Sequence, residues 1–238
     1  MRTSPIRFLR VRFQAPTLLL PELSQFYLGC LEARRADGET DLLAVEVGET
    51  VVELSAADGA PFYHFALLVP GDRFAAALDW ARDRVELLFD PESDDAVFDF
   101  TNWDAKACYF HDPAGNIVEL IAHRGVGEAG ATGPFASDEL IGVSEVGVVG
   151  DPPSLARELE RVLDLAVWDG TVDGEARLAF VGEKARTLIL CRVGRGWLPT
   201  RRPAEAHPVE VVLSGSSEGE VSWAGGGQVR GTGTPASG

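Results

Sequence analysis

One ionisable side chain interrupts an apolar run near the middle of the chain. Glu119 lies within the run Ile-Val-Glu-Leu-Ile-Ala at positions 117–122. Short apolar runs of this kind form buried strands. A carboxylate in such a strand either turns to water or is held by a partner, because an unpaired buried charge is costly. Carboxylates that are held in this way serve as metal ligands or move protons. Glu119 is therefore the first candidate for a functional residue.

Glu119 belongs to a predicted β-hairpin that covers residues 109–124. Its first strand is aromatic and apolar and ends at His111. The segment Asp-Pro-Ala-Gly-Asn at 112–116 has the composition of a turn, because Pro fixes φ and Gly or Asn accepts a positive φ. Residues 117–122 form the second strand.

The hairpin resembles the closing hairpin of the vicinal oxygen chelate superfamily, which includes glyoxalase I, extradiol ring-cleavage dioxygenases and bleomycin-resistance proteins. A second stretch, Val-Val-Glu-Leu-Ser at 51–55 followed by Tyr-His-Phe-Ala-Leu-Leu-Val at 63–69, resembles the junction between two units of these proteins. The resemblance covers residues 6–124 in order. It implies an α+β, glyoxalase-like fold of paired βαβββ units, in which curled sheets enclose a pocket.

The apolar pattern of residues 1–124 agrees with two such units in one domain. The predicted elements of the first unit are a strand at 6–14, an amphipathic helix at 18–31 and strands at 32–36, 42–47 and 50–56. The second unit has a strand at 63–69, a helix at 72–84, a strand at 85–89, an acidic loop at 90–104 and the hairpin.

The rest of the chain reads as a linker, a truncated third unit and a tail. Residues 125–138 have four glycines and no periodicity, which is typical of a linker. Residues 139–215 repeat the plan of residues 6–71, with an amphipathic helix predicted at 152–165 whose inward face includes Leu155, Leu159 and Leu163. They form a partial domain, which is expected to cover the first domain or to pair with a second copy of the chain in a homodimer. The Gly- and Ser-rich residues 216–238 are predicted to be disordered.

The resemblance also implies a site for a divalent metal, formed by four inward-facing residues. The positions that match are Arg10, Glu53, His64 and Glu119. The metal ligands are thus expected to be Glu53, His64 and Glu119, with Fe²⁺, Mn²⁺, Ni²⁺ or Zn²⁺ as the ion. Glu119 is also the expected proton-moving catalytic base. Arg10 cannot bind a metal, so it either binds an anionic group of the substrate or takes the place of the metal against a carboxylate.

Other residues of interest have more than one interpretation. Trp103 and Tyr109 are candidates for substrate binding at the pocket mouth, although aromatic residues more often belong to a core. His123 is expected to be solvated. In the third unit Glu145 occupies the position of Arg10, but the counterparts of Glu53 and His64 are approximately Leu190 and Pro208. The sequence therefore predicts no metal site within that copy.

Composition limits the classes of partner. A formal charge of −16 argues against binding to nucleic acid or to an anionic membrane. No apolar run reaches the roughly 18 residues that a transmembrane helix needs, and the first residues lack the apolar stretch of a secretory signal. The three cysteines, Cys30, Cys108 and Cys191, form no disulfide framework, which favours the reducing cytoplasm.

Two functions agree with these features. The first is a metal-dependent enzyme of the glyoxalase or ring-cleavage dioxygenase kind, acting on a small oxygenated molecule. The second is a metal-free protein of the bleomycin-resistance type that binds a small molecule, for which the acidic surface would suit a cationic ligand.

Overall fold

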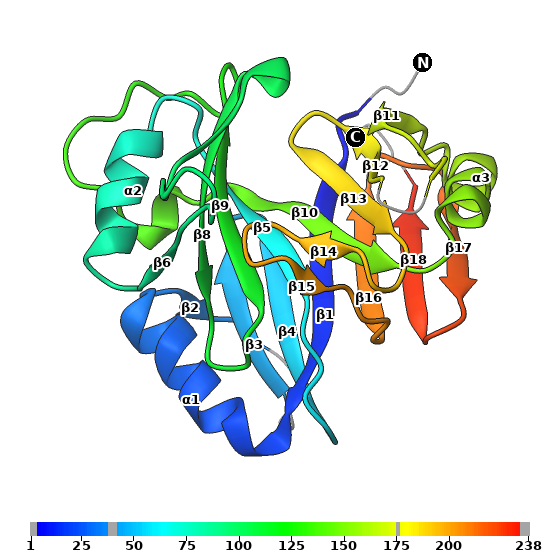
Figure 1. Ribbon diagram of the computed structural model, residues 1–238, viewed down its shortest axis with the longest axis horizontal. Coiled ribbons are helices and arrows are strands. Elements are labelled where there is room, and N and C mark those ends of the chain that lie inside the picture. Colours follow the sequence, from blue (N-terminus) through cyan, green and yellow to red (C-terminus); the bar gives the residue numbers. More distant parts are fainter. Residues whose placement is uncertain (1–3, 38–41, 175–176, 234–238) are drawn as a thin grey trace.

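The computed structural model describes residues 4–37, 42–174 and 177–233. Two large sheets dominate the fold, and helices lie on the outside (Figure 1). We call them the β1 sheet, with seven strands, and the β5 sheet, with nine. The expected α+β architecture of βαβββ units is confirmed. None of the helices in the described ranges has the length and apolar character needed to cross a membrane.

Each large sheet is mixed, with parallel and antiparallel neighbours. The β1 sheet contains, in spatial order, β17 (Glu218–Trp223), β18 (Gly227–Thr232), β16 (Val209–Ser214), β1 (Arg7–Pro16), β4 (Thr50–Ala57), β3 (Leu42–Val47) and β2 (Arg34–Arg35). The β5 sheet contains β11 (Val167–Gly170), β12 (Ala179–Glu183), β13 (Arg186–Cys191), β10 (Gly142–Val149), β5 (His64–Val69), β9 (Ile117–His123), β8 (Ala105–His111) and β6 (Leu87–Leu88), and β7 (Phe98–Phe100) also pairs with β8. A small third sheet joins β14 (Gly196–Trp197) to β15 (Arg202–Pro203).

Three α-helices accompany the sheets. The helices are α1 (Leu20–Ser24), which continues into a π-helical segment at Gln25–Cys30, α2 (Phe74–Arg82) and α3 (Pro152–Leu163). The start of α3 follows from its sequence, because the Asp151 side chain accepts a hydrogen bond from the Ser154 amide and prolines occupy the first turn. Its buried stripe includes Leu155, Leu159 and Leu163, which is the amphipathic spacing that the sequence predicts.

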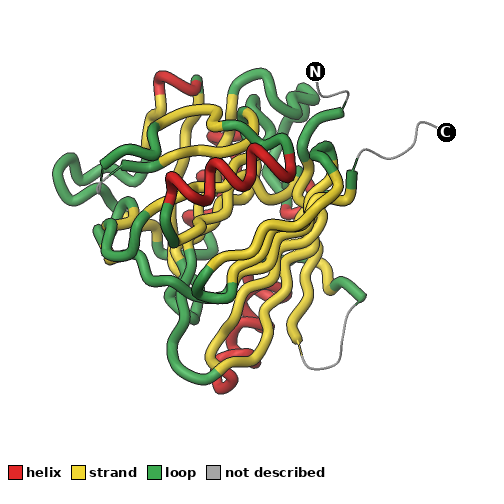
Figure 2. The backbone as a smooth tube through the Cα atoms, turned by 90° about the vertical axis from the view of Figure 1, so that its right-hand side faces the viewer, coloured by secondary structure: helices red, strands yellow, loops and turns green. Residues whose placement is uncertain are grey.

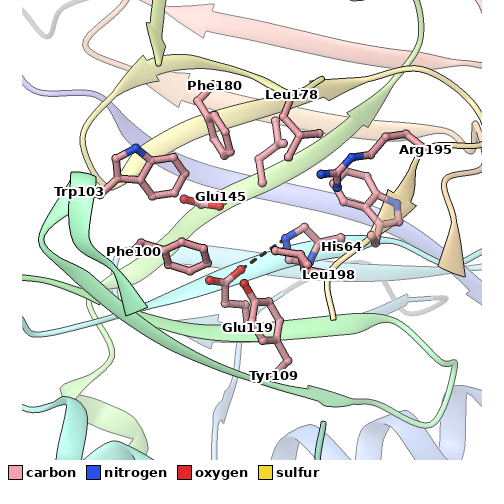
Figure 3. Close-up of a pocket in the computed structure, with 12 residues that line it drawn as sticks. His64, Phe100, Trp103, Tyr109, Glu119, Glu145, Leu178, Phe180, Arg195 and Leu198 are labelled. Atoms are coloured by element: carbon pink, nitrogen blue, oxygen red, sulfur yellow. Dashed lines mark ion pairs between the residues drawn. The ribbon is translucent and has the colours of Figure 1, made fainter. Parts of the chain in front are cut away.

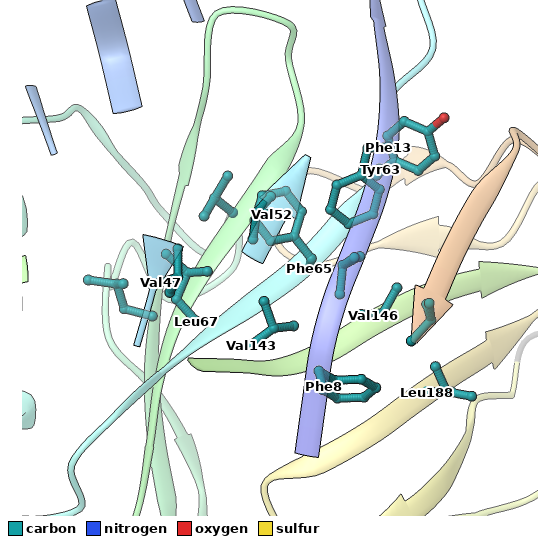
Figure 4. Packing of buried hydrophobic residues seen from close by; sticks show 14 of the residues in the cluster. Phe8, Phe13, Val47, Val52, Tyr63, Phe65, Leu67, Val143, Val146 and Leu188 are labelled. Carbon is teal, nitrogen blue, oxygen red and sulfur yellow. The ribbon is translucent and has the colours of Figure 1, made fainter. Parts of the chain in front are cut away.

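The main core lies between the two sheets, which pack face to face (Figures 2 and 4). Phe13 of β1 stacks on Phe65 of β5, with ring centroids 4.8 Å apart. Val143 and Val146 of β10 enter the same core. A second apolar cluster covers the opposite face of the β5 sheet. Alternate residues of the central strands of this sheet therefore enter two different environments.

The pairing of the units differs from the order along the chain. The second unit, which begins with β5, joins the third through the antiparallel pair β5–β10. The first unit, which begins with β1, joins the C-terminal strands through the antiparallel pair β1–β16. Strands that precede the segment 125–138 thus pair with strands that follow it. That segment is anchored by buried Arg73, which donates hydrogen bonds to Glu139 and to three backbone carbonyls between 131 and 134.

The expectation of a disordered tail is corrected for residues 216–233, which include β17 and β18; residues 234–238 lie outside the described part of the chain. Val221 and Val229 are buried. Some of the glycines that indicated disorder are sites of close packing instead. A Cβ atom at Gly219 would lie 2.7 Å from Val162 Cγ1 of α3, and one at Gly231 would lie 2.2 Å from the Ser217 carbonyl oxygen.

Candidate functional site

Three ionisable side chains converge on the outer face of the β5 sheet. His64, Glu119 and Glu145 come from β5, β9 and β10, which are adjacent strands. Each side chain offers one ligand atom, and these atoms all lie within 4.8 Å of one another. The three residues are only 5%, 2% and 3% exposed, respectively. Figure 3 shows them pointing toward one another at the base of a pocket.

A bulge in β10 gives Glu145 its direction. The register with β5 shifts between Val143 and Glu145. In an unbroken strand these two side chains would share a face, because side chains alternate. The bulge turns Glu145 to the pocket, so that Val143 and Val146 both enter the core between the sheets. A corresponding shift in β1, between Phe8 and Arg10, supports the repeat that places Arg10 and Glu145 at equivalent positions.

His64 presents an unprotonated nitrogen to the cluster. Its Nδ1 lies 3.1 Å from the Ile117 carbonyl oxygen. Because a carbonyl can only accept, the proton of the neutral ring must be on Nδ1. Burial lowers the pKa of His64 to about 4, so the ring is neutral near pH 7. Its Nε2 then faces Glu119 Oε2 at 3.4 Å as an acceptor, and either a proton on the carboxyl group or a cation between the two atoms would satisfy it.

The carboxyl groups of Glu119 and Glu145 lie together in one buried pocket, where ionising both would bring like charges close. Burial raises the pKa of Glu119 well above its ordinary value, and the nearby Glu145 raises it further. Burial also raises the pKa of Glu145. Thr187, the register partner of Glu145 on β13, is fully buried, and its hydroxyl has no hydrogen-bond partner within the described ranges. Two carboxylates and one neutral imidazole form a donor set that fits a divalent cation.

Tyr109 holds Glu119 from the side of β8. Its hydroxyl donates a hydrogen bond to the Glu119 carboxylate. Burial, together with the negative charges of Glu119 and Glu145, raises the pKa of Tyr109 well above its usual range. The phenol therefore stays protonated at any ordinary pH, and it keeps one oxygen of Glu119 in place.

The strand pair β10–β13 repeats the geometry of the pair β5–β9, but the residue of β13 that corresponds to Glu119 is apolar. On β5 and β9, His64 lies two residues before Ala66, whose register partner is Glu119. On β10 and β13, Glu145 lies two residues before Gly147, whose register partner is Ile189. Ile189 also lines the pocket. The cluster is thus a three-ligand site whose fourth side, beside Ile189, is left without a protein donor.

Aromatic rings form the walls above the cluster. The cavity has a volume of about 50 Å³, and its walls include Phe100, Trp103, Phe180 and Trp197. Trp103 packs edge-on against Phe180, with ring centroids 4.5 Å apart. Its indole N–H donates a hydrogen bond to the Asp169 carboxylate. The Trp197 ring lies 5.0 Å from that of His64. The space holds a few water molecules or the polar end of a small organic molecule.

The structure brings together four of the residues expected at the site and separates two. His64, Trp103, Tyr109 and Glu119 share the pocket. Glu53 and Arg10 lie in the β1 sheet. Glu53 does not join the cluster there.

Glu53 is bound by guanidinium groups instead. Its Oε2 accepts from Arg12 Nε at 2.7 Å, and Arg10 Nε is 3.8 Å from the same oxygen. The residue that holds this carboxylate most closely is therefore Arg12, a residue that the sequence interpretation did not single out. The positive charge next to the Glu53 carboxylate is therefore a guanidinium, at the position where the resemblance implied a metal.

The sequence interpretation missed two charged residues of the pocket, Glu145 and Arg195. Glu145 has the same signal as Glu119, a carboxylate within an apolar strand. The sequence interpretation considered metal-ligand partners for Glu145 only within the third unit, whereas His64 and Glu119 belong to the second. Arg195 lies in the loop between β13 and β14, where no pattern in the sequence distinguishes it from other arginines.

His123, which was expected to be solvated, is fully buried on β9. Burial lowers its pKa to about 4, and the charges of Lys184 and Arg186 act in the same direction. The unfolded chain, with a histidine pKa near 6.5, therefore binds more protons than the folded one below that pH. The stabilisation is fully present above pH 6.5 and is lost as the pH falls toward 4.

We expect the lowered pKa of His123 to reduce the free energy of unfolding by about 2 kcal/mol as the pH falls from 7 to 5. Urea unfolding gives the free energy of unfolding of the wild type and of His123→Leu at both pH values. The wild type should lose about 2 kcal/mol more than the variant when the pH falls from 7 to 5. His111→Leu is the control, because His111 is exposed on the same hairpin and should leave the pH dependence as it is. An identical pH dependence of the wild type and His123→Leu would contradict the prediction.

Comparisons with known proteins identify the fold. No protein-family model matches the chain, and no curated protein sequence matches it. A provisionally assigned dioxygenase from Bacillus subtilis has a similar structure, with a TM-score of 0.59, 13% identity, and coverage of 96% of this chain and 85% of that one. Glyoxalase I from Zea mays is also similar, with a TM-score of 0.51, 15% identity, and coverage of 88% of this chain and 74% of that one. The expected resemblance to vicinal oxygen chelate proteins is thus confirmed for the fold.

Proposed function

We propose that this chain, which has the fold of glyoxalase I, is a metal-dependent enzyme that transfers a proton on a small oxygenated substrate. The observation that carries the proposal is the convergence of His64, Glu119 and Glu145 within 4.8 Å at the base of a pocket. His64 Nε2 and one oxygen from each carboxylate would hold the ion. This set differs from the expected set of Glu53, His64 and Glu119 in one residue, because Glu145 takes the place of Glu53.

A divalent ion at this point supplies a Lewis acid that attracts neighbouring substrate oxygens and stabilises negative charge on them. The donor set has one imidazole and several oxygens, which suits Mn²⁺, Fe²⁺, Ni²⁺ or Zn²⁺. The open side beside Ile189 leaves room for the substrate.

Glu119 is the residue that would move the proton. Its carboxylate is buried, so its pKa is raised well above its ordinary value, and a raised pKa makes a carboxyl group a better proton acceptor. Tyr109 orients the carboxylate through its hydrogen bond and stays protonated itself. The aromatic walls exclude water, which strengthens each of these interactions.

The donor set favours proton transfer over ring cleavage by dioxygen. Iron enzymes that activate dioxygen typically use two histidines and one carboxylate. The described part of the pocket has the opposite ratio, with one histidine and two carboxylates. We therefore place the glyoxalase-like reaction ahead of the dioxygenase-like one.

Metal analysis of protein purified without chelator tests the proposal. The protein is then loaded in turn with Mn²⁺, Fe²⁺, Ni²⁺ and Zn²⁺, and bound metal is measured after gel filtration. We expect one equivalent per chain. We also expect the loaded protein to exchange the C–H hydrogens of hydroxyacetone with deuterium in D₂O, and Glu119→Gln to bind metal more weakly and to lose the exchange.

Two results would overturn the proposal in different ways. Failure to bind any of the four metals would favour the metal-free small-molecule binder. Stoichiometric metal without proton exchange on any small hydroxy ketone, hydroxy aldehyde or hydroxy acid would leave the metal site and remove the proposed reaction.

A further inference from the structure

One cationic side chain of the pocket has no counter-ion. Arg195 lines the cavity, and its guanidinium points into the space above His64 (Figure 3). Within the ranges that the structure describes, it forms no ion pair with an acidic side chain. Arg195 and His64 line the same cavity. A half-buried guanidinium without a carboxylate partner is costly unless a ligand completes it.

Backbone hydrogen bonds fix the position of Arg195 in its loop. The Arg195 amide donates to the Arg192 carbonyl, and the Arg195 carbonyl accepts from the Ala204 amide. The next residues form β14, whose Trp197 packs beside His64. The loop is thus fixed at both ends of the residue. Burial lowers the pKa of Arg195, in agreement with partial exclusion of water around it.

Counting charges indicates the substrate class. The lining residues that would carry charge when a metal is bound are Glu119, Glu145 and Arg195, because a histidine must be neutral to bind a metal. Two carboxylates balance a divalent ion, which leaves the single positive charge of Arg195. One negative charge on the substrate would make the closed pocket neutral.

We infer that the site takes a small monoanion, a carboxylate with a second oxygen on the neighbouring carbon, and that Arg195 selects its charge by a forked hydrogen bond. This inference rests on the proposed metal site. The cavity of about 50 Å³ limits the polar end of the substrate to a few heavy atoms. Leu178 and Phe180 also line the cavity, so an apolar remainder of the substrate would fit beside them.

Two probes with the same carbon skeleton test the selection. Lactate and propane-1,2-diol both have neighbouring oxygens, but only lactate is an anion. Each is titrated into Co²⁺-loaded protein, with the visible absorption of Co²⁺ and calorimetry as readouts. We expect Arg195→Gln to weaken lactate binding roughly 10- to 100-fold, because a charge-assisted hydrogen bond to a partly desolvated group is lost. Diol binding should change less than about 2-fold.

The control is Arg192→Gln, on the same loop. Arg192 Nη1 is paired with Asp151 Oδ1 at 3.0 Å, so this substitution removes an arginine without changing the pocket. Lactate affinity should stay as in the wild type. Arg195→Lys keeps the charge and loses the fork, and it should give an intermediate affinity. Circular dichroism and Co²⁺ stoichiometry establish that each variant is folded.

The outcomes separate the two proposals. If Co²⁺ binds but Arg195→Gln leaves lactate affinity unchanged, or weakens lactate and diol equally, the inference about the substrate fails and the metal site stands. If Co²⁺ does not bind stoichiometrically, the proposed function fails, and the charge count fails with it.

Discussion

Replacing Glu145 with glutamine is expected to weaken binding of a divalent ion by more than about 100-fold. Loss of an outer hydrogen-bonding partner alone typically costs roughly 10- to 100-fold in metal affinity, and loss of one of three protein ligands costs more. The fold should survive, because the substitution removes one of two carboxylates that repel each other in a buried pocket. Competition with a chromophoric chelator for Zn²⁺ measures the affinity, and the melting temperature of the metal-free protein measures the fold.

Glu53→Gln is the matched control for this prediction. Glu53 is also a nearly buried glutamate on a central strand, but it lies in the β1 sheet and pairs with Arg12. Its replacement should leave Zn²⁺ affinity unchanged within about 2-fold. If Glu53→Gln lost the metal and Glu145→Gln kept it, the ligand set expected from the family resemblance would be right and the site described here would be wrong.

A polar residue in place of Val229 is expected to destabilise the protein by roughly 3 kcal/mol or more. Val229 is fully buried on β18, where it faces Val211 of β16 and Val221 of β17. In Val229→Asn the buried amide would have no hydrogen-bond partner, and apolar burial would be lost as well. Chemical unfolding followed by tryptophan fluorescence measures the change.

The neighbouring substitution Arg230→Asn supplies the comparison. Arg230 is exposed on the opposite face of the same strand, so the change should cost less than about 1 kcal/mol. A disordered tail would make both substitutions neutral. An equal and small effect of the two would therefore refute the packing of β18 on its neighbours.

Local patterns in the sequence predicted most of the elements. The hairpin around Glu119 and the amphipathic stripe of α3 have clear periodicity, and both lie where they were expected. Such signals are local, because each depends on residues within one strand or one helix. The resemblance then supplied the α+β plan that joins them.

The site could be predicted only in part, because two of its determinants are not local. Glu145 reaches His64 only because β10 pairs with β5, a contact between different units that no strand encodes by itself. Its direction also depends on the bulge after Val143, and a one-residue shift exchanges the two faces of a strand. Glu53, by contrast, matches a family motif and lies in the other sheet.

The tail illustrates a different limit. Glycine is frequent in disordered segments because it is flexible, but it is also the residue that allows backbones to approach closely. Composition alone does not separate these two uses. At Gly219 and Gly231 the second applies, since α3 and the turn before β17 occupy the space that a side chain would need.

The pairing of β1 with β16 has a consequence for how the molecule is made. The β5 sheet consists of residues 64–191, so its strands can assemble while synthesis of the later residues continues. β1 leaves the ribosome first but must wait for residues 209–214, about 10 to 40 s later at typical elongation rates. During that interval one edge of β1 is exposed, and this nascent edge is the point at which chaperone binding or misassembly during translation would begin.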